Sequence, residues 1–133
     1  MRLELMKKTE LALRAALFLA DHAGEGPVKG ASLASELRTT VSYLPQVMRP
    51  LVQAGWVSSD PGPLGGYQFA ADLRSVTLLM LIEAVEGPTR DDRCVLRGTP
   101  CPDVDGCAMH EAWSTAREAL LAELEATSLS NMA

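Results

Sequence analysis

Three cysteines and a histidine lie in one short stretch near residue 100, and their side chains have the clearest potential for chemistry in this chain. The spacing is Cys94, six residues, Cys101, five residues, Cys107, two residues, His110. Thiolate and imidazole groups are ligands of zinc, and thiolates also hold iron–sulfur clusters. Because two prolines and two glycines lie among these residues, we predict a loop rather than a helix or strand. This loop is therefore a candidate metal or redox site.

The loop alone leaves three interpretations open. Three cysteines and one histidine fit a Cys₃His zinc site, whereas three thiolates with a fourth ligand from elsewhere fit an iron–sulfur cluster. Zinc fingers of this kind usually carry aromatic and basic RNA contacts around their ligands, but this loop is acidic, with Asp91, Asp92, Asp103 and Asp105. A metal-free thiol switch is the third interpretation.

The composition limits the class of protein. The 133 residues, 47% of them apolar and 22% charged, fit one domain with an ample core. An odd number of cysteines argues against a secreted disulfide framework. No signal peptide is evident, and the longest apolar segment, residues 11–20, is too short to span a bilayer, so we expect a cytoplasmic protein without a membrane partner. We find no Ser/His/Asp set, Walker loop or dinucleotide fingerprint, and we predict that the chain is not an enzyme.

The net charge of −5 is unevenly distributed along the sequence. Residues 1–53 contain seven basic and five acidic residues, a net charge of +2, whereas the rest of the chain has a net charge of −7. A mildly basic half attached to an acidic body permits binding to nucleic acid phosphates without requiring it.

The elements before the loop form a pattern typical of DNA-binding domains. We predict a first helix from Thr9, as its cap, to about Ala23, and this helix is apolar enough to be central and buried. Residues 31–37 form a short second helix, and a third begins near 41 and ends by Gly55, with Pro50 expected to kink it or end its regular part. Two short helices joined by a tight turn indicate a helix-turn-helix motif.

Two β-prone runs, residues 56–59 and 65–70, follow and predict a hairpin that would be a wing. A helix over 75–85 precedes the loop, and a last helix over 109–126 leaves an apolar side that a second subunit would cover. The fold class is therefore mainly α: a winged helix-turn-helix with a small β-hairpin wing and a long C-terminal dimerisation helix. We divide the chain into a DNA-binding domain (1–87), a cysteine-rich cluster-binding loop (88–108) and a dimerisation helix with its tail (109–133).

Taken together, these segments resemble the Rrf2 superfamily of bacterial winged-helix regulators, in particular the group that contains the iron–sulfur regulator IscR and the nitric-oxide-sensitive repressor NsrR. The resemblance extends in order over nearly the whole chain. Two positions depart from it, because Pro61 and Leu64 stand where the wing of the family usually has Arg and Gly. The matching stretches are MRLEL, ELALRAALFLA, SYLPQVMRPLVQAGWV, GPLGGYQFA, TLLMLIEAVEGP and the three cysteines followed by HEAW.

The resemblance implies a homodimer that binds a palindromic double-stranded DNA operator and holds a 2Fe–2S or 4Fe–4S cluster on Cys94, Cys101 and Cys107. Two residues are candidates for the fourth ligand. His110 matches the histidine ligand of the IscR type, and Glu10 matches a carboxylate that NsrR-like proteins supply from the other subunit. The alternatives from the residues themselves are a helix-start role for His110 and an i,i+4 ion pair for Glu10.

The DNA-binding candidates follow from position in the motif, since arginine and glutamine pair favourably with guanine and adenine. They are Ser42, Tyr43, Gln46 and Arg49 on the third helix, Arg2, Lys7, Lys8 and Arg14 for phosphates, and Gly65 and Gly66 in the wing. We expect a transcriptional repressor that senses nitric oxide, redox state or iron and cluster status. The alternative is a zinc-stabilised or metal-free thiol-switch winged-helix protein, and an electron carrier is a further rival.

Overall fold

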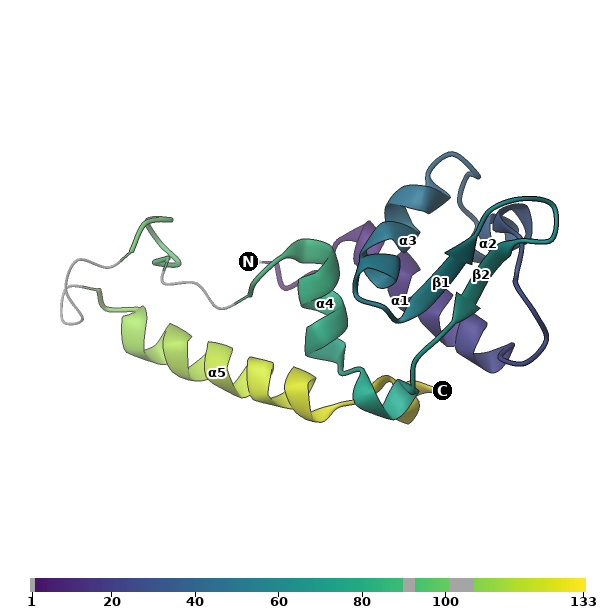
Figure 1. The fold of residues 1–133 in the computed structure, drawn as a ribbon. Helices are drawn as coiled ribbons and strands as arrows, with labels where there is room; N and C mark the ends of the chain where they lie inside the picture. The colour runs from purple at the N-terminus through teal and green to yellow at the C-terminus, as the bar shows by residue number, and fades with distance from the viewer. Residues whose placement is uncertain (1, 90–92, 101–106) are drawn as a thin grey trace.

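The computed structural model describes residues 2–89, 93–100 and 107–133, and its elements confirm a mainly α winged helix-turn-helix with a β-hairpin and a long C-terminal helix (Figure 1). The elements are α1 (Lys7–Asp21), α2 (Gly30–Leu37), α3 (Leu44–Gln53), β1 (Val57–Asp60), β2 (Gly66–Phe69), the 3₁₀ turn η1 (Leu73–Ser75), α4 (Leu78–Glu86), α5 (His110–Ala126) and the 3₁₀ turn η3 (Leu129–Met132).

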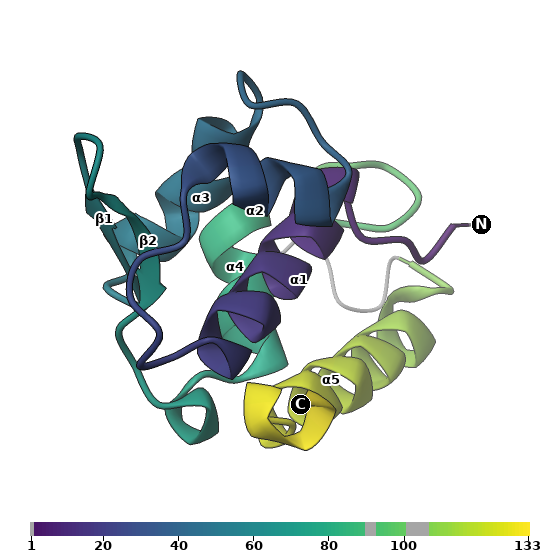
Figure 2. The same cartoon turned by 90° about the vertical axis from the view of Figure 1, so that its right-hand side faces the viewer.

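Helix α1 is the central helix of the fold and contacts α2, α3, α4 and β2 (Figure 2). Its buried face is rich in alanine, which lets neighbouring helices approach closely, and the prediction of a central helix is confirmed. The expected cap was wrong, however. The helix begins at Lys7 after Met6, two residues before Thr9, and Thr9 is buried with its hydroxyl directed to Glu86 of α4.

The turn between α2 and α3 is held by backbone bonds and one side chain. Arg38 ends α2 in the left-handed region, with φ at 56°, and the Thr39 N–H donates to the Ala34 carbonyl over 2.9 Å. The Tyr43 N–H donates to the Thr40 hydroxyl over 3.1 Å at the start of α3. Pro50 does not end α3, because the helix continues through this buried residue to Gln53.

The wing is an antiparallel hairpin in which Val57 pairs with Phe69 and Asp60 with Gly66, so the predicted hairpin is confirmed. A third segment, which the sequence pattern does not reveal, joins it. Val28 forms a bridge with Tyr67 through two backbone hydrogen bonds of 2.9 and 2.8 Å. This bridge attaches the wing to the loop before α2.

The end of the chain folds back onto the start of α4. Leu78 donates its N–H to the Thr127 carbonyl over 2.9 Å, and Leu129 donates to the Val76 carbonyl over 2.8 Å. Leu129 is fully buried and belongs to the same core as α1 and α3. Helix α5 therefore starts at the cysteine loop and has its C-terminal end fixed beside η1 and α4 (Figure 1).

Candidate functional site

The outward face of α3 carries most of the predicted base contacts. Gln46 and Arg49 on α3 and Ser42 in the turn before it are exposed, while Leu44 and Val47 on the opposite side of the helix are buried. Tyr43 differs from its expected outward position, because it is half-buried and packs against the core. The face thus offers a guanidinium, an amide and a hydroxyl to a partner, which are groups suited to hydrogen-bonding base edges.

The basic residues at the start of α1 are partly engaged within the protein. Glu10 accepts an ion pair from Lys7 over 2.6 Å and another from Arg14 over 3.2 Å. The hydrogen bond from Lys7 is the main reason that the pKa of Glu10 is lowered, and Arg14 adds to the effect. Arg2 is exposed and Lys8 half-buried, so both remain candidates for phosphate contacts.

Arg14 also binds the end of α2. Its guanidinium donates to the carbonyl oxygens of Leu37 over 3.3 Å and Glu36 over 3.2 Å. These are carbonyls of the last turn of α2, which have no partner inside that helix. The structure therefore shows Arg14 as a link from α1 to the helix-turn-helix, and its contact with phosphate stays a prediction.

The two wing glycines lie where no side chain fits. A Cβ on Gly65 would overlap the backbone carbonyl of Asp60, and one on Gly66 would overlap the carbonyl of Val28. Gly66 also has a φ of +146°, which side-chain-bearing residues rarely adopt. The two glycines thus lie beside Lys29 and the start of α2, and the neighbouring Leu64 is 93% exposed.

Two of the three cysteines meet in the structure. The sulfur atoms of Cys94 and Cys107 are 3.6 Å apart, Cys94 is buried and Cys107 is half-buried. Cys101 lies outside the described residues. In the ranges that the structure describes, no group of three or more His, Cys, Asp and Glu side chains is close enough to hold a metal ion.

The backbone around these sulfurs is well defined by hydrogen bonds. The Cys94 N–H donates to the Thr99 carbonyl and the Gly98 N–H donates to the Cys94 carbonyl, each over 2.8 Å, which closes a tight turn. On the other side, the His110 N–H donates to the Cys107 carbonyl over 3.1 Å. His110 is thus the half-buried first residue of α5, one turn from Cys107.

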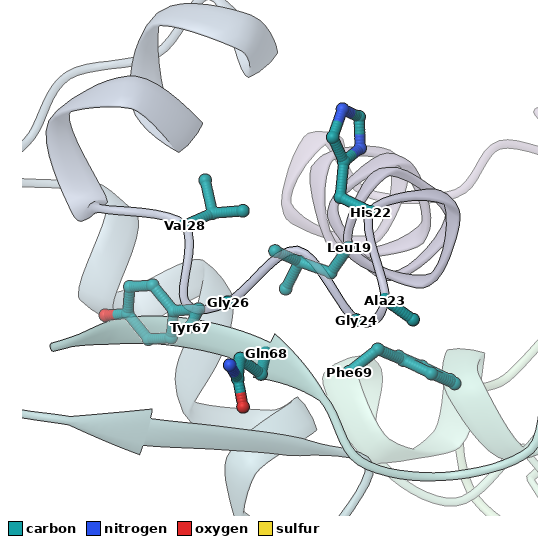
Figure 3. A pocket seen from close by; sticks show the side chains of 9 residues that line it. All are labelled: Leu19, His22, Ala23, Gly24, Gly26, Val28, Tyr67, Gln68 and Phe69. Atoms are coloured by element: carbon teal, nitrogen blue, oxygen red, sulfur yellow. The ribbon is translucent and has the colours of Figure 1, made fainter.

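A pocket of about 330 Å³ lies elsewhere, between the end of α1 and β2 (Figure 3). Leu19, Val28 and Phe69 supply apolar parts of its wall, and His22 and Gln68 supply polar groups. His22, at its edge, places Nδ1 2.9 Å from the Phe18 carbonyl at the C-terminal end of α1. None of the predicted site residues lines this pocket.

Comparison with known proteins identifies the family. Residues 5–133 match Rrf2, described as an iron-dependent transcriptional regulator. The chain belongs to the Rrf2 family. IscR of Vibrio campbellii, named as an HTH-type transcriptional regulator, is 32% identical over 111 residues, which cover 84% of this chain and 66% of that protein.

Solved structures agree with this assignment. CymR of B. subtilis, titled the global cysteine regulator, has a TM-score of 0.77 at 28% identity, covering 98% of this chain and 96% of that one. IscR of T. potens has a TM-score of 0.72 at 28% identity, covering 98% and 85%. This Rrf2 protein is therefore a transcriptional regulator related to IscR and not an enzyme. None of the helices in the described part of the chain is long and apolar enough to cross a membrane.

Proposed function

We propose that this Rrf2 protein binds an operator as a homodimer and represses transcription according to the state of an iron–sulfur cluster on Cys94, Cys101 and Cys107. The observation that carries the proposal is the meeting of Cys94 and Cys107, whose sulfurs are 3.6 Å apart although 13 positions separate them in sequence. An IscR-related chain that brings two thiols together beside a helix start has the donor set that iron–sulfur chemistry uses.

The geometry of the pair fits two ligands of one metal ion. Two sulfurs bound at about 2.3 Å to one tetrahedral ion are separated by about 3.8 Å. The observed 3.6 Å is close to this value, so Cys94 and Cys107 could bind the same metal ion with little rearrangement. His110 follows Cys107 by one turn and is one candidate for a further ligand, and Glu10 of the second subunit is the other. When bound, the cluster would supply a centre that reacts with nitric oxide or oxidants.

The DNA half of the proposal rests on the exposed face of α3 and on the wing beside it. In a dimer the two recognition helices would enter successive major grooves, about 34 Å apart, on a palindromic operator. Exposed apolar side chains supply a surface for the second subunit, including Leu120 on α5 and Met80 on α4, which are 50% and 42% exposed.

A series of hydrogen bonds connects the region of the cysteine loop with the helix-turn-helix. Glu86, at the end of α4 and just before the cysteine loop, accepts hydrogen bonds from the Met6 N–H and the Thr9 hydroxyl at the start of α1. One turn further along α1, Arg14 binds the last carbonyls of α2. A change in the position of the loop would thus be transmitted through Glu86 to α1, and through Arg14 to the helix-turn-helix.

An anaerobic preparation tests the cluster first. We expect visible sulfur-to-iron charge-transfer bands with matching iron and sulfide contents, and a loss of these bands in Cys94→Ser and Cys107→Ser. Glu10→Ala and His110→Ala would then identify the fourth ligand, because only the ligand variant should destabilise the cluster.

Operator affinity, measured by fluorescence anisotropy on a sequence selected from a random pool, should differ between cluster-bound and cluster-free protein at fixed salt. Equal operator affinity of the cluster-bound and cluster-free forms would contradict the proposal.

A second candidate function is a metal-free or zinc-stabilised thiol switch on the same winged helix. The short distance between Cys94 and Cys107 favours it as well, because two thiols this close can also bind zinc or be oxidised. A colourless protein that contains zinc, or no metal after attempted reconstitution, would support this function and leave the DNA-binding proposal in place.

A further inference from the structure

The separation of Cys94 and Cys107 is short enough for a covalent bond between their sulfurs. A disulfide requires about 2.05 Å between sulfurs, so the observed 3.6 Å has to shrink by about 1.5 Å. Each sulfur is one bond from its Cβ, and rotation about the two Cα–Cβ bonds provides movements of this size. We propose that a hydroperoxide oxidises this pair to a Cys94–Cys107 disulfide, and that the disulfide and the iron–sulfur cluster exclude each other. The exclusion of the cluster rests on the proposed function, whereas the disulfide itself does not.

Backbone hydrogen bonds hold both cysteines in place. Cys94 is held in its turn by hydrogen bonds with Thr99 and Gly98, each of 2.8 Å. Cys107, three residues before α5, is held by the bond of 3.1 Å between its carbonyl and the His110 N–H. Since the two sulfurs already lie close together, closing the bond requires little loss of chain freedom. The new bond would join the turn around Cys94 directly to the segment that leads into α5.

The burial of the two sulfurs sets the order of events. Cys107 is half-buried and can be reached by a small peroxide, whereas Cys94 is only 6% exposed. Because oxidation of thiols follows their exposure, Cys107 is the residue attacked by peroxide and Cys94 is the resolving residue.

The steps balance with hydrogen peroxide as the oxidant. The Cys107 sulfur attacks one peroxide oxygen, the O–O bond breaks, and the departing hydroxide takes the thiol proton as water, which leaves a sulfenic acid. The Cys94 sulfur then attacks the Cys107 sulfur, the S–O bond breaks, and a second hydroxide leaves with the Cys94 proton as water. Two thiols are oxidised by two electrons, and one peroxide is reduced to two waters.

The consequence for the cluster follows from the sulfurs themselves. A disulfide sulfur is not a thiolate ligand, so oxidation removes two of the three proposed cysteine ligands at once. A bound cluster would in turn occupy both sulfurs and protect them from peroxide. Oxidised protein would therefore stay cluster-free until a reductant restores the thiols.

Peptide mapping of full-length cluster-free protein after treatment with hydrogen peroxide tests the pairing. Cleavage by trypsin after Arg93 and Arg97, and by an Asp-specific protease before Asp103 and Asp105, places the three cysteines on three different peptides. We expect peptide 94–97 linked to peptide 105–117 without reduction, and the same linkage in the control variant Cys101→Ser. A linkage that contains Cys101, a disulfide between two chains, or sulfinic acid without any disulfide would overturn the proposal.

Two further readouts separate this inference from the proposed function. In Cys94→Ser, dimedone should trap a sulfenic acid on Cys107, whereas Cys107→Ser should give no adduct on Cys94. The reverse pattern would overturn the order of attack.

Oxidised wild-type protein should gain only background visible absorbance with iron and sulfide. After reduction with dithiothreitol, the same treatment should produce the absorbance of the cluster. Cluster formation on the disulfide form would overturn the exclusion. If reduced protein forms no cluster either, the proposed function fails while the peptide map still decides the disulfide.

Discussion

The hydroxyl of Thr9, in the first turn of α1, donates a hydrogen bond to the carboxylate of Glu86, the last residue of α4. The two residues are 77 positions apart in sequence, and Thr9 is 1% exposed. The same carboxylate oxygen also accepts the N–H of Met6, the residue that precedes α1. A single side chain at the end of α4 thus fixes the start of the central helix.

Thr9→Val should lower the free energy of unfolding. Valine has nearly the same shape, so the substitution removes the hydroxyl and leaves the packing of α1 largely unchanged. The loss should be about 1–2 kcal/mol, as for a buried hydrogen bond to a charged group that water can partly replace. Urea denaturation followed by circular dichroism measures it, with the exposed Thr115→Val on α5 as the matched control. Equal losses in the two variants would contradict a role for the bond to Glu86.

Thr9 also illustrates which parts of the fold the sequence can predict. Periodicity predicted the central apolar helix, the hairpin and the last helix, because each depends on neighbouring residues. The preference of threonine for caps suggested that the helix begins there, but a partner 77 positions away takes its hydroxyl and the helix begins at Lys7. In the same way, the Val28–Tyr67 bridge and the return of Leu129 to the core depend on long-range pairing that local patterns do not contain.

In the candidate site, too, the features that depend on neighbouring residues could be predicted and those that depend on long-range contacts could not. The exposed face of α3 follows from helical spacing, so Gln46 and Arg49 lie outward as predicted. The half-burial of Tyr43 was missed because it precedes the regular part of α3, where helical spacing no longer determines direction. The spacing of the cysteines indicated a shared site without revealing which two sulfurs meet. That pairing depends on the turn around Cys94 and on where α5 begins.

Arg38→Gly should raise the free energy of unfolding. Arg38 ends α2 with φ at 56°, a left-handed conformation that costs residues with a Cβ about 1 kcal/mol and glycine little. We expect a gain of about 0.5–1 kcal/mol in urea denaturation. Arg38→Ala is the matched control, since it removes the same charge and keeps the unfavourable conformation. A gain in both variants would show that the charge, and not the backbone, determines the effect.

Asp72→Asn should lower stability at neutral pH and have a smaller effect in acid. Hydrogen bonds from the side chain and backbone of Arg74 lower the pKa of Asp72 below its usual value of 3.8. Because the folded-state pKa is the lower one, the stabilisation is complete above the unfolded pKa and is lost as pH falls through the folded pKa. The difference in urea midpoint between the variant and the wild type should therefore be the same at pH 7 and 5 and begin to shrink at pH 3. Asp60→Asn, in the wing, is the control, and a constant difference at every pH would contradict the assignment.

Arg49→Ala should weaken binding to the operator much more than binding to unrelated DNA. An exposed guanidinium on the outward face of α3 can form a bidentate contact with guanine, which contributes about 1–3 kcal/mol of discrimination. We expect operator affinity to fall about 5- to 150-fold in fluorescence anisotropy at fixed salt, with little change for a scrambled sequence. The control is Arg74→Ala, which removes one positive charge from η1, where it pairs with Asp72. An equal loss on both DNA sequences would assign Arg49 to phosphate instead.

Lys8→Gln should weaken binding to all DNA sequences to a similar extent. Lys8 lies half-buried in the first turn of α1, and its predicted partner is a phosphate. Each lost phosphate contact releases about one fewer counterion, so the slope of log affinity against log salt concentration should become shallower by about 1. Titrations between 50 and 200 mM salt, on operator and scrambled DNA, measure both effects. Lys7→Gln is an informative comparison, because Lys7 is already paired with Glu10 and should change the slope less. An unchanged slope for Lys8→Gln would place this lysine away from the DNA backbone.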